Sequence, residues 1–383
     1  MKKTVLITGG AGFIGSHLSD ELIAHGYSVR VLDNLLEQVH GSSGRKPAYL
    51  NEDVEFINGD VRDKTTLHKA LHGVDVVYHF AARVGVGQSM YAIRDYTEVN
   101  NIGTAQLLEL LIEQPVEKLI VASSMSVYGE GLYRKTDSGI IENADRSTDQ
   151  LRNGIWELYD ENGNILQPVP TPEWKSPRLA SVYALGKYDQ EQLCLITGKA
   201  YGIDTTALRF FNVYGTRQAL SNPYTGVLAI FASRYLNNNP PRIFEDGQQR
   251  RDFVSVYDVA RACRLALESD KSNSEVFNIG SGNSYTVADI AELMGQVLGK
   301  DHLQPEITGE YRKGDIRHCY ADISKARQIL GFTPEVNFTD GLTELCEWLR
   351  GQTSNDHVQK ASSELLARGL TIKGQILTEI EKS

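Results

Sequence analysis

The sequence has 383 residues, of which 41% are hydrophobic and 23% charged, enough to bury the core of one large domain or two ordinary ones. Its 39 basic and 49 acidic side chains give a formal net charge of −10, which argues against nucleic acid or an anionic membrane as a partner bound through bulk charge. The four cysteines form no CxxC pair, and no apolar run reaches the roughly 18 residues of a membrane span. Glycines interrupt the apolar run of the opening MKKTVLITGG, so we interpret it as a first strand and not as a signal peptide. We therefore expect a cytoplasmic protein with no metal site, no membrane partner and no nucleic-acid partner.

Short apolar runs rich in β-branched residues alternate with longer amphipathic stretches through the first half of the chain. The runs predict strands at residues 4–8, 28–33, 54–58, 74–80, 118–123 and 205–211. The amphipathic stretches predict helices at residues 12–24, 65–72, 102–113 and 182–201. This alternation predicts an α/β fold with a doubly wound parallel sheet and helices on both of its faces.

Residues 130–180 break the alternation, because they are polar and contain scattered prolines, and we expect an insertion on the surface of the sheet domain. Residues 252–267 have the pattern of a strand and a helix that return to the main sheet. The whole pattern predicts three parts: a sheet domain of residues 1–212 with 252–275, a smaller C-terminal α/β substrate-binding portion of residues 213–251 with 276–351, and a weakly helical tail of residues 352–383.

A glycine-rich turn follows the first predicted strand and opens the first predicted helix. Gly9, Gly12 and Gly15 form a GxxGxxG pattern, which lets a pyrophosphate approach the backbone and the N-terminus of the helix. Asp33 ends the second predicted strand 18 residues after Gly15, where a carboxylate binds ribose hydroxyls and repels a 2′-phosphate. The pattern predicts a Rossmann-type nucleotide site that takes NAD in preference to NADP.

Asp60 and Val61 follow the third predicted strand, at the same edge of the predicted sheet. A carboxylate at this place can meet the adenine amino group of the cofactor, but it can equally cap the helix that comes next. Both interpretations of Asp60 stay open on the sequence alone.

A second group of residues is suited to acid–base chemistry. Tyr183 and Lys187 form a YxxxK pattern on the fourth predicted helix, which places them one turn apart on the same face. A lysine ammonium there lowers the pKa of the phenol, so that the tyrosinate can act as a base near neutral pH. Ser124 lies in SSMSVYG after the fifth predicted strand, where its hydroxyl can bond a substrate oxygen. Taken singly, these patterns are weak, since YxxxK arises by chance and paired serines after a strand are typical of helix caps.

Several motifs occur in one order between about residue 3 and residue 350: TGGAGFIG, HFAA, SSMSVYG, YALGK and RFFNVYG. With them the chain resembles the extended short-chain dehydrogenase/reductase family, and within it the nucleotide-sugar epimerases and dehydratases. The resemblance implies a Rossmann-type fold, NAD as the cofactor, and catalytic roles for Ser124, Tyr183 and Lys187. The expected cofactor-binding residues are Gly9, Gly12, Phe13, Ile14, Gly15, Asp33, Asn34, Asp60, Val61, Phe80, Ala81, Ala82, Asn100, Ser123, Tyr183 and Lys187.

The resemblance also implies a nucleotide-diphosphate sugar as the substrate. The expected substrate-binding residues are Arg83, Ser124, Ser126, Asn212, Arg251 and Arg312. Planar guanidinium groups suit two phosphates, and they supply locally the positive charge that the whole chain lacks. By family analogy we also expect a homodimer that forms through a pair of helices.

The residues that follow Ser124 favour one reaction within the family. A 4,6-dehydratase carries an Asp-Glu pair there and a decarboxylating relative a glutamate, whereas this chain has Met125 and Ser126. Without a carboxylate, elimination lacks its acid and its base, so the resemblance implies inversion at C4 through a transient 4-keto sugar. The insertion resembles that of dTDP-L-rhamnose 4-epimerases, which favours a dTDP-6-deoxyhexose. The alternatives are a UDP-hexose 4-epimerase, a nucleotide-4-ketosugar reductase and, outside the enzymes, an NAD-sensing regulatory protein.

Overall fold

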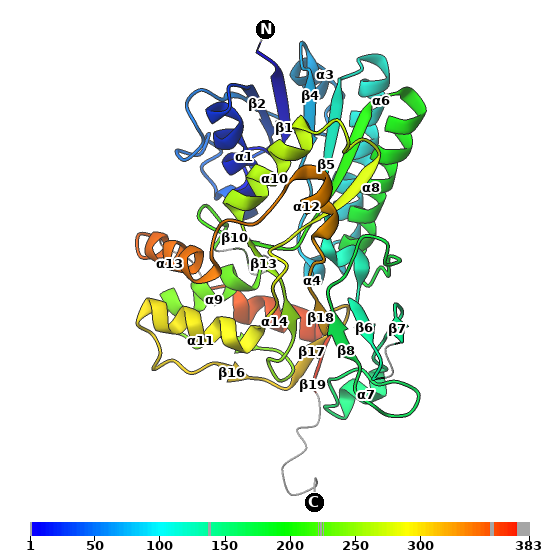
Figure 1. Cartoon of the computed structure of the whole chain (residues 1–383). Coiled ribbons are helices and arrows are strands. Elements are labelled where there is room, and N and C mark those ends of the chain that lie inside the picture. Colours follow the sequence, from blue (N-terminus) through cyan, green and yellow to red (C-terminus); the bar gives the residue numbers. More distant parts are fainter. Residues whose placement is uncertain are drawn as a thin grey trace, which may run out of the picture.

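The computed structural model describes residues 2–136, 139–220, 222, 224, 226–352 and 356–373, and its largest feature is a seven-stranded parallel sheet (Figure 1). The strand order is β14 (Glu275–Ile279), β9 (Asp204–Phe210), β5 (Lys118–Ser124), β4 (Val76–His79), β1 (Thr4–Thr8), β2 (Ser28–Asp33) and β3 (Glu55–Asn58). The order reverses between β1 and β4, and in such sheets ligands bind at the carboxyl ends of the strands beside that point. The predicted doubly wound sheet is confirmed.

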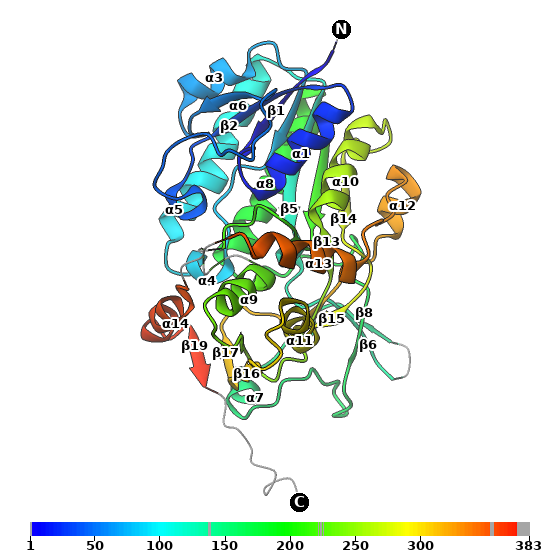
Figure 2. The same ribbon diagram turned by 90° about the vertical axis from the view of Figure 1, so that its left-hand side faces the viewer.

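Helices cover both faces of the sheet, and this explains the continuous apolar runs of its strands. β4 and β5 are buried at every residue, as expected for central strands of a parallel sheet covered on two sides. Val5 and Ile7 of β1 face one apolar core, and Leu6 faces the other. The first core lies under α1 (Phe13–Ala24) and α10 (Val256–Glu268), which pack against each other (Figure 2). The second lies under α3 (Lys64–Leu71), α6 (Gly103–Glu113) and α8 (Val182–Tyr201).

The strand predicted within residues 252–267 does not join the main sheet, and that expectation is wrong. β13 (Phe253–Ser255) pairs instead with β10 (Asn212–Tyr214), because Ser255 ends the strand after three residues by capping α10. Its helix does cover the main sheet, and β14 then adds the seventh strand. The sheet therefore includes residues 276–279, which we had predicted in the smaller portion. The rest of the division into domains stays a prediction.

The smaller portion packs three helices around a core of its own. These are α9 (Val227–Leu236), α11 (Val287–Leu298) and α13 (Phe338–Leu349). The short strands of this half are β11 (Arg242–Ile243), β12 (Arg250–Arg251), β15 (Tyr285–Thr286), β16 (Glu306–Ile307), β17 (Glu310–Arg312) and β18 (His318–Cys319), and α12 (Ser324–Leu330) follows them. The remaining short helices of the chain are α2 (Glu37–His40), α4 (Val86–Ser89), α5 (Ile93–Thr97), the π-helix η1 (Glu98–Ile102) and the 3₁₀-helix η2 (Met125–Tyr128).

The insertion of residues 130–180 forms a small antiparallel sheet from β6 (Leu132–Arg134), β7 (Ile140–Ile141) and β8 (Gln167–Val169), with one helical turn, α7 (Thr148–Arg152). It binds to the smaller portion through backbone hydrogen bonds. Gly131 N donates to His318 O at 2.8 Å, and Thr171 N donates to Tyr320 O at 2.8 Å. It also contacts the sheet domain, because Arg209 of β9 donates to Glu173 O at 3.3 Å and Asn278 N of β14 donates to Glu173 Oε1 at 2.8 Å. Residues 137 and 138 of the insertion lie outside the described residues.

The C-terminal segment turns back onto the molecule. α14 (Val358–Ala367) is followed by β19 (Thr371–Lys373), which pairs antiparallel with β17 (Figure 2). Residues 374–383 of the predicted tail lie outside the described residues. None of the helices in the described ranges is long and apolar enough to cross a membrane.

Candidate active site

A cavity of about 640 Å³ lies along the carboxyl edge of the large sheet and extends to the smaller portion. The loop between β1 and α1, the ends of β2, β4 and β5, and the start of α8 line its sheet side. Residues around 242–253 and 312–316 line its other side. The cavity therefore lies at the point where the strand order of the sheet reverses.

The glycine loop forms one end of this cavity. Gly9 has φ +71°, and a Cβ atom there would lie 2.8 Å from Ala81 N. A Cβ atom on Gly15 would lie 2.5 Å from the Cα atom of Gly10. Gly12 precedes the first turn of α1 and caps it with no side chain, so the amides of Phe13 and the residues after it face the cavity end without a capping group. Free N–H groups at a helix N-terminus are suited to a pyrophosphate.

Asp33 ends β2 and lines the cavity beside the glycine loop. Its Oδ2 accepts a hydrogen bond from Ala11 N at 3.1 Å, and its Oδ1 accepts one from Leu35 N at 2.9 Å. His40 Nε2 lies 3.6 Å from Oδ1. Two backbone amides thus fix a buried carboxylate whose oxygens each have a further lone pair for a ribose hydroxyl.

Asp60 lines the cavity but does not cap a helix, so the helix-cap interpretation is wrong. Asp63 is the N-cap residue of α3 and accepts hydrogen bonds from Thr65 N and Thr66 N. Asp60 instead accepts from the guanidinium and backbone N–H of Arg62 and from Asn34 Nδ2 at 2.9 Å. The hydrogen bonds from the Arg62 side chain are the main reason why the pKa of Asp60 falls to about 2. The ionised carboxylate of Asp60 is therefore fixed at the cavity wall by Arg62 and by the amide of Asn34.

A buried asparagine, Asn100, holds the backbone of the cavity wall next to β4. Phe80, Ala81 and Ala82 line the cavity directly after β4. Asn100, on the π-helix η1, is not among the lining residues; its Oδ1 accepts from Arg83 N at 2.7 Å and its Nδ2 donates to Arg83 O at 3.1 Å. Asn100 thus holds the chain after Ala82 in place and does not itself face the cavity.

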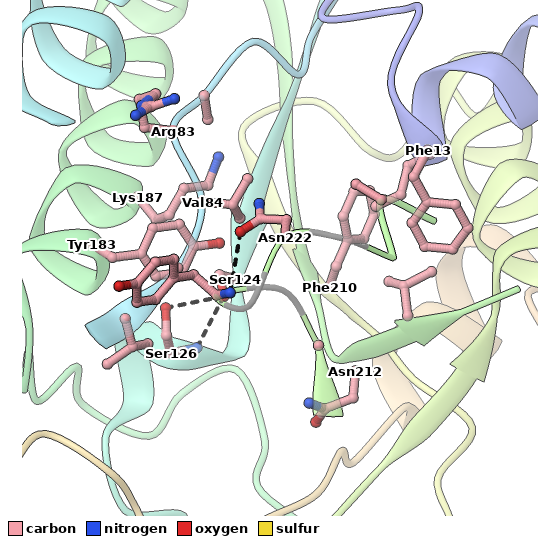
Figure 3. Close-up of a pocket in the computed structure, with 18 of the residues that line it drawn as sticks. Phe13, Arg83, Val84, Ser124, Ser126, Tyr183, Lys187, Phe210, Asn212 and Asn222 are labelled. Carbon is pink, nitrogen blue, oxygen red and sulfur yellow. Dashed lines mark hydrogen bonds between the residues drawn. The ribbon is translucent and has the colours of Figure 1, made fainter. Parts of the chain in front are cut away.

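Ser124, Tyr183 and Lys187 come together at the centre of the cavity wall (Figure 3). Ser124 ends β5, and its hydroxyl is bonded to Ser126 Oγ at 3.0 Å and accepts from Ser126 N at 3.2 Å. Ser124 therefore also caps η2, the plainer role that the sequence allowed. Ser181 caps α8, which then directs Tyr183 and Lys187 one turn apart toward Ser124.

Three more of the expected cofactor residues, Val61, Ser123 and Ile14, also line the cavity. Val61 is buried and lines the cavity beside Asp60. Ser123 also lines it, but its hydroxyl donates to Glu191 Oε2 at 2.6 Å and is therefore already engaged. Ile14 lies with Phe13 on the glycine-loop side of the cavity.

The expected substrate residues all line the cavity, but they differ in the hydrogen bonds and ion pairs that they already make within the protein. Arg251 donates to the carbonyl oxygens of Ile316 at 2.6 Å and Arg317 at 2.9 Å, and it forms no ion pair within the described part of the chain. Asn212 has a buried Oδ1 without a partner. These two side chains therefore leave hydrogen-bonding capacity for a ligand.

Arg312 and Arg83 are each paired with a carboxylate, which the sequence did not indicate. Arg312 Nε donates to Asp315 Oδ2 at 2.8 Å, and its guanidinium lies 4.5 Å from the centroid of the Phe244 ring. Arg83 Nε lies 2.6 Å from an Oδ atom of Asp95. Both guanidiniums are thus weaker candidates for an anion than Arg251.

The model of the NAD dependent epimerase/dehydratase family matches residues 5–148 and 157–280. The chain belongs to this family. The dTDP-L-rhamnose 4-epimerase of Burkholderia thailandensis is 34% identical over 351 residues, which cover 91% of this chain and 95% of the relative. The solved UDP-glucose 4-epimerase of Thermotoga maritima with UDP-glucose is 34% identical, with a TM-score of 0.73 and coverage of 91% and 98%. That of Thermus thermophilus, in complex with NAD, is 30% identical, with a TM-score of 0.71 and coverage of 91% and 100%.

These likenesses confirm four expectations: the family, the Rossmann-type fold, an enzyme class of nucleotide-sugar 4-epimerases, and NAD as the cofactor. The residues present fit NAD, because Gly9 and Gly15 leave no room for a side chain in the glycine loop and the Asp33 carboxylate is fixed beside that loop at the end of β2. Among the described residues no group of three His, Cys, Asp or Glu side chains is arranged to hold a metal ion.

The pKa values of the two epimerase-family residues on α8 differ from the expected pattern. Burial raises the pKa of Tyr183, and a hydrogen bond with Ser124 opposes this rise. Burial also lowers the pKa of Lys187, to about 8. The lowering of the Tyr183 pKa by Lys187 is therefore not found in this structure, where Lys187 Nζ donates to Gln190 Oε1 at 2.8 Å.

A buried chain of polar groups behind Lys187 was missed by the sequence analysis. Gln190 donates to Thr104 Oγ1 at 2.9 Å, and His79 bonds Thr104 Oγ1 and Thr8 Oγ1 at 2.8 Å each. Burial, with the charge of Lys187, lowers the pKa of His79 to about 3, so its ring is neutral. The signal for Gln190 is its place three residues after Lys187 on the same face of the helix. The partners on β1 and β4 depend on the tertiary structure.

Proposed function

We propose that the protein inverts C4 of a nucleotide-diphosphate sugar through a transient 4-keto sugar, with Tyr183 as the proton-transferring base. The observation that carries this proposal is the meeting of Ser124, Tyr183 and Lys187 in the one cavity that also contains the glycine loop. An NAD-binding protein that only senses its cofactor needs none of the three.

The proton and the hydride that leave the sugar both return to it within the site. Tyr183, as the phenolate, removes the proton of the sugar O4, while the hydrogen on C4 leaves with its electron pair. NAD, held by the glycine loop and Asp33, would supply the acceptor for that hydride. Ser124 holds the sugar oxygen, and its hydrogen bond with Tyr183 opposes the burial that raises the pKa of the phenol. Lys187, whose ammonium donates to Gln190, lies one helical turn from Tyr183 and is assigned to the cofactor. The 4-keto sugar then rotates in the cavity, so that the opposite face of C4 receives the hydride. Tyr183 returns the proton to O4, and no net oxidation occurs.

The residues next to Ser124 favour epimerisation over dehydration. Elimination of the 6-hydroxyl needs an acid and a base beside the sugar, and the two positions after Ser124 hold Met125 and Ser126. Ser126 is bonded to Ser124 and offers no carboxylate. This part of the wall can therefore bind a sugar but not remove water from it.

The diphosphate of the substrate is assigned to the opposite side of the cavity. Arg251 has a guanidinium without an ion-pair partner in the described chain, and Asn212 has a free buried amide oxygen beside its donor group. Arg312 adds a second guanidinium that Asp315 partly neutralises. Guanidinium forks suit the two phosphates of a nucleotide-diphosphate sugar.

For the sugar itself we propose a dTDP-6-deoxyhexose such as dTDP-L-rhamnose. The relative from Burkholderia thailandensis supports this substrate. So do the apolar residues Val84, Met125 and Ala180 in the cavity lining, because they suit a methyl group at C6 better than a hydroxymethyl group. A UDP-hexose is the second candidate, supported by the equal identity to the Thermotoga maritima enzyme.

We also propose that the protein is a homodimer. Leu185, Leu193 and Ile196 project apolar side chains from one face of α8 into solvent. A second copy of the same helix can cover such a face by a two-fold contact. Light scattering after gel filtration is expected to give twice the mass of the chain, and a monomer mass would contradict the proposal.

The experiment for the proposed function follows the substrate by NMR in a panel of dTDP- and UDP-sugars. We expect one C4 epimer to form from the other with catalytic NAD only. Deuterium at C4 should remain in the product, because the hydride leaves and returns within one site. Loss of that label, or consumption of one NADH per product, would identify a 4-ketosugar reductase. No turnover of any sugar, with NAD binding intact, would favour the NAD-sensing role.

A further inference from the structure

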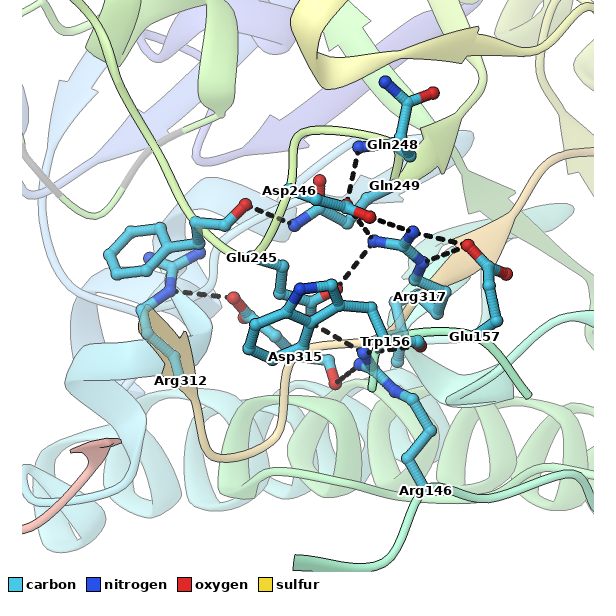
Figure 4. A network of polar contacts seen from close by, with 12 residues as sticks. Arg146, Trp156, Glu157, Glu245, Asp246, Gln248, Gln249, Arg312, Asp315 and Arg317 are labelled. Atoms are coloured by element: carbon cyan, nitrogen blue, oxygen red, sulfur yellow. Dashed lines mark hydrogen bonds and ion pairs between the residues drawn. The ribbon is translucent and has the colours of Figure 1, made fainter. Parts of the chain in front are cut away.

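A buried ionic cluster joins the insertion to the substrate side of the cavity (Figure 4). At its centre lies Arg317, whose side chain is fully buried. Its guanidinium bonds Glu245 at 2.9 Å, Asp246 at 2.6 Å and Glu157 of the insertion. The three carboxylates come from two segments far from Arg317 in the sequence.

A second guanidinium, that of Arg146 in the insertion, completes the cluster. Arg146 donates to Glu245 Oε1 at 2.7 Å and lies 3.5 Å from Glu130 Oε1. Glu130 in turn accepts from the backbone N–H of Arg317 at 2.7 Å and of His318 at 3.2 Å. We call Glu130, Arg146, Glu157, Glu245, Asp246 and Arg317 the ionic cluster. Buried charges of this kind are costly unless each is paired, so the cluster has few alternative arrangements.

The cluster reaches Arg251 through the backbone. The side chain of Arg251 donates to the carbonyl oxygens of Ile316 and Arg317, and Glu130 binds the N–H of Arg317. The position of the Arg251 guanidinium therefore depends on a stretch of backbone that the insertion fixes.

The cluster reaches Arg312 by a second route. Glu245 N donates to Glu310 O at 2.7 Å, at the start of the strand that carries Arg312. Phe244, directly before Glu245, lies under the Arg312 guanidinium. Glu245 itself has φ +53°, a strained conformation for a non-glycine residue, which persists here because Arg146 and Arg317 both bind its carboxylate.

We propose that residues 130–180 form a positioning element, which holds Arg251 and Arg312 in the geometry that binds the diphosphate. This inference rests on the proposed function. Glu157 and Arg146 are its positioning residues: neither lines the cavity, and both act through Glu245 and Arg317. Loosening the cluster weakens the capture of the nucleotide-diphosphate part of the substrate and leaves NAD binding on the glycine-loop side unchanged.

The test uses Glu157→Gln, at the partly exposed edge of the cluster, which removes the charge while keeping the shape. Its matched control is Glu161→Gln, in the same insertion, where the lost partner is Lys135 in an exposed ion pair. We expect Glu157→Gln to raise KM for the sugar and the dissociation constant of dTDP or UDP by about tenfold. We expect its kcat and its NAD affinity, and all values of the control, to stay within about twofold.

A double-mutant cycle separates positioning from general stability. In the Arg251→Ala background, Glu157→Gln should change KM by less than about threefold, because the route through Arg251 is gone and only the route through Arg312, which Asp315 already neutralises in part, remains. An undiminished additional effect, or an unchanged KM with a lowered melting temperature, would overturn the proposal. If Glu157→Gln does not fold, Asp246→Asn, also at the exposed edge, takes its place in the same cycle.

Calorimetry of nucleotide binding distinguishes a failure of the proposed function from a failure of the positioning role. A wild-type protein that binds neither dTDP nor UDP contradicts the proposed function at this side of the cavity. A wild-type protein that binds one of them, with the same affinity in Glu157→Gln, contradicts the positioning role only.

Discussion

The two sides of the cavity are built in different ways. On the cofactor side, the glycine loop and Asp33 lie within the first 33 residues of the chain, and backbone amides fix the Asp33 carboxylate. On the substrate side, Arg251 depends on carbonyls 65 and 66 residues away, and Arg317 bonds a carboxylate 160 residues away. The glycine loop and Asp33 are thus local to one βαβ unit, whereas the arginines on the other side of the cavity are held by contacts between segments far apart in the sequence.

The largest expected effect lies between the two sides, at Tyr183. Tyr183→Phe removes the ionisable oxygen and leaves the ring, so kcat should fall by at least about 10²-fold while NAD affinity and folding persist. Steady-state kinetics and NAD calorimetry measure this. Tyr201→Phe, at the exposed end of the same helix, is the control and should leave kcat unchanged. A normal kcat in Tyr183→Phe would remove Tyr183 from the mechanism.

The next effect tests the substrate side alone. Arg251→Ala should raise KM by about 30-fold to 1,000-fold, the loss of about 2–4 kcal/mol expected for one partner of a buried charged hydrogen bond. Arg312→Ala should raise KM less, because Asp315 already pairs with it. Arg250→Ala, next to Arg251 but outside the cavity lining, serves as the control. NAD affinity should not change in any of these variants, and if NAD affinity falls while KM rises, the two sides are not independent.

A smaller effect is expected from the cofactor side. Asp33→Asn keeps the shape of the side chain and removes its charge. The affinity for NAD should therefore fall by about tenfold, and the ratio of NAD affinity to NADP affinity should decrease. The KM of the sugar at saturating NAD should stay the same. Asp53→Asn, on the exposed turn before β3, is the matched control. Calorimetry that finds tighter NADP than NAD binding in the unaltered protein would contradict the role of Asp33.

The smallest effect is a shift in pH dependence. The hydrogen bond of Ser124 opposes the burial that raises the pKa of Tyr183. Ser124→Ala removes this bond, so the pKa of Tyr183 rises further, the phenolate forms only at higher pH, and the rising limb of the kcat profile moves to higher pH. Ser126→Ala, which loses only a bond to Ser124, should leave the limb in place. A limb that moves to lower pH in Ser124→Ala would show that Tyr183 is not the titrating group.

Much of the fold was predictable because its signals are local. The strands at residues 4–8 and 28–33 have the predicted bounds, since a buried parallel strand needs a continuous apolar run. The helix Val182–Tyr201 also has its predicted bounds, with Ser181 as its cap. The strand within residues 252–267 was placed incorrectly, although its helix was not, because the pattern of a three-residue strand does not specify its partner.

The candidate site divides in the same manner. The sequence by itself determined the glycine loop, Asp33 and the Tyr183–Lys187 pair, because a tight turn and a one-turn helical spacing need no distant partner. Only the tertiary structure decided that Asp63 and not Asp60 caps α3, since both residues offer the same carboxylate to the same turn.

Only the tertiary structure decided, too, which charges remain available to a ligand. Arg251 and Arg312 look alike in the sequence, yet one binds backbone carbonyls and the other a carboxylate. The insertion has a polar composition without a helical or strand periodicity of apolar residues. Its ionic contact with Arg317 joins residues that are 160 positions apart. Ion pairs depend on distance in space and on burial, and neither is written in the spacing of residues along the chain.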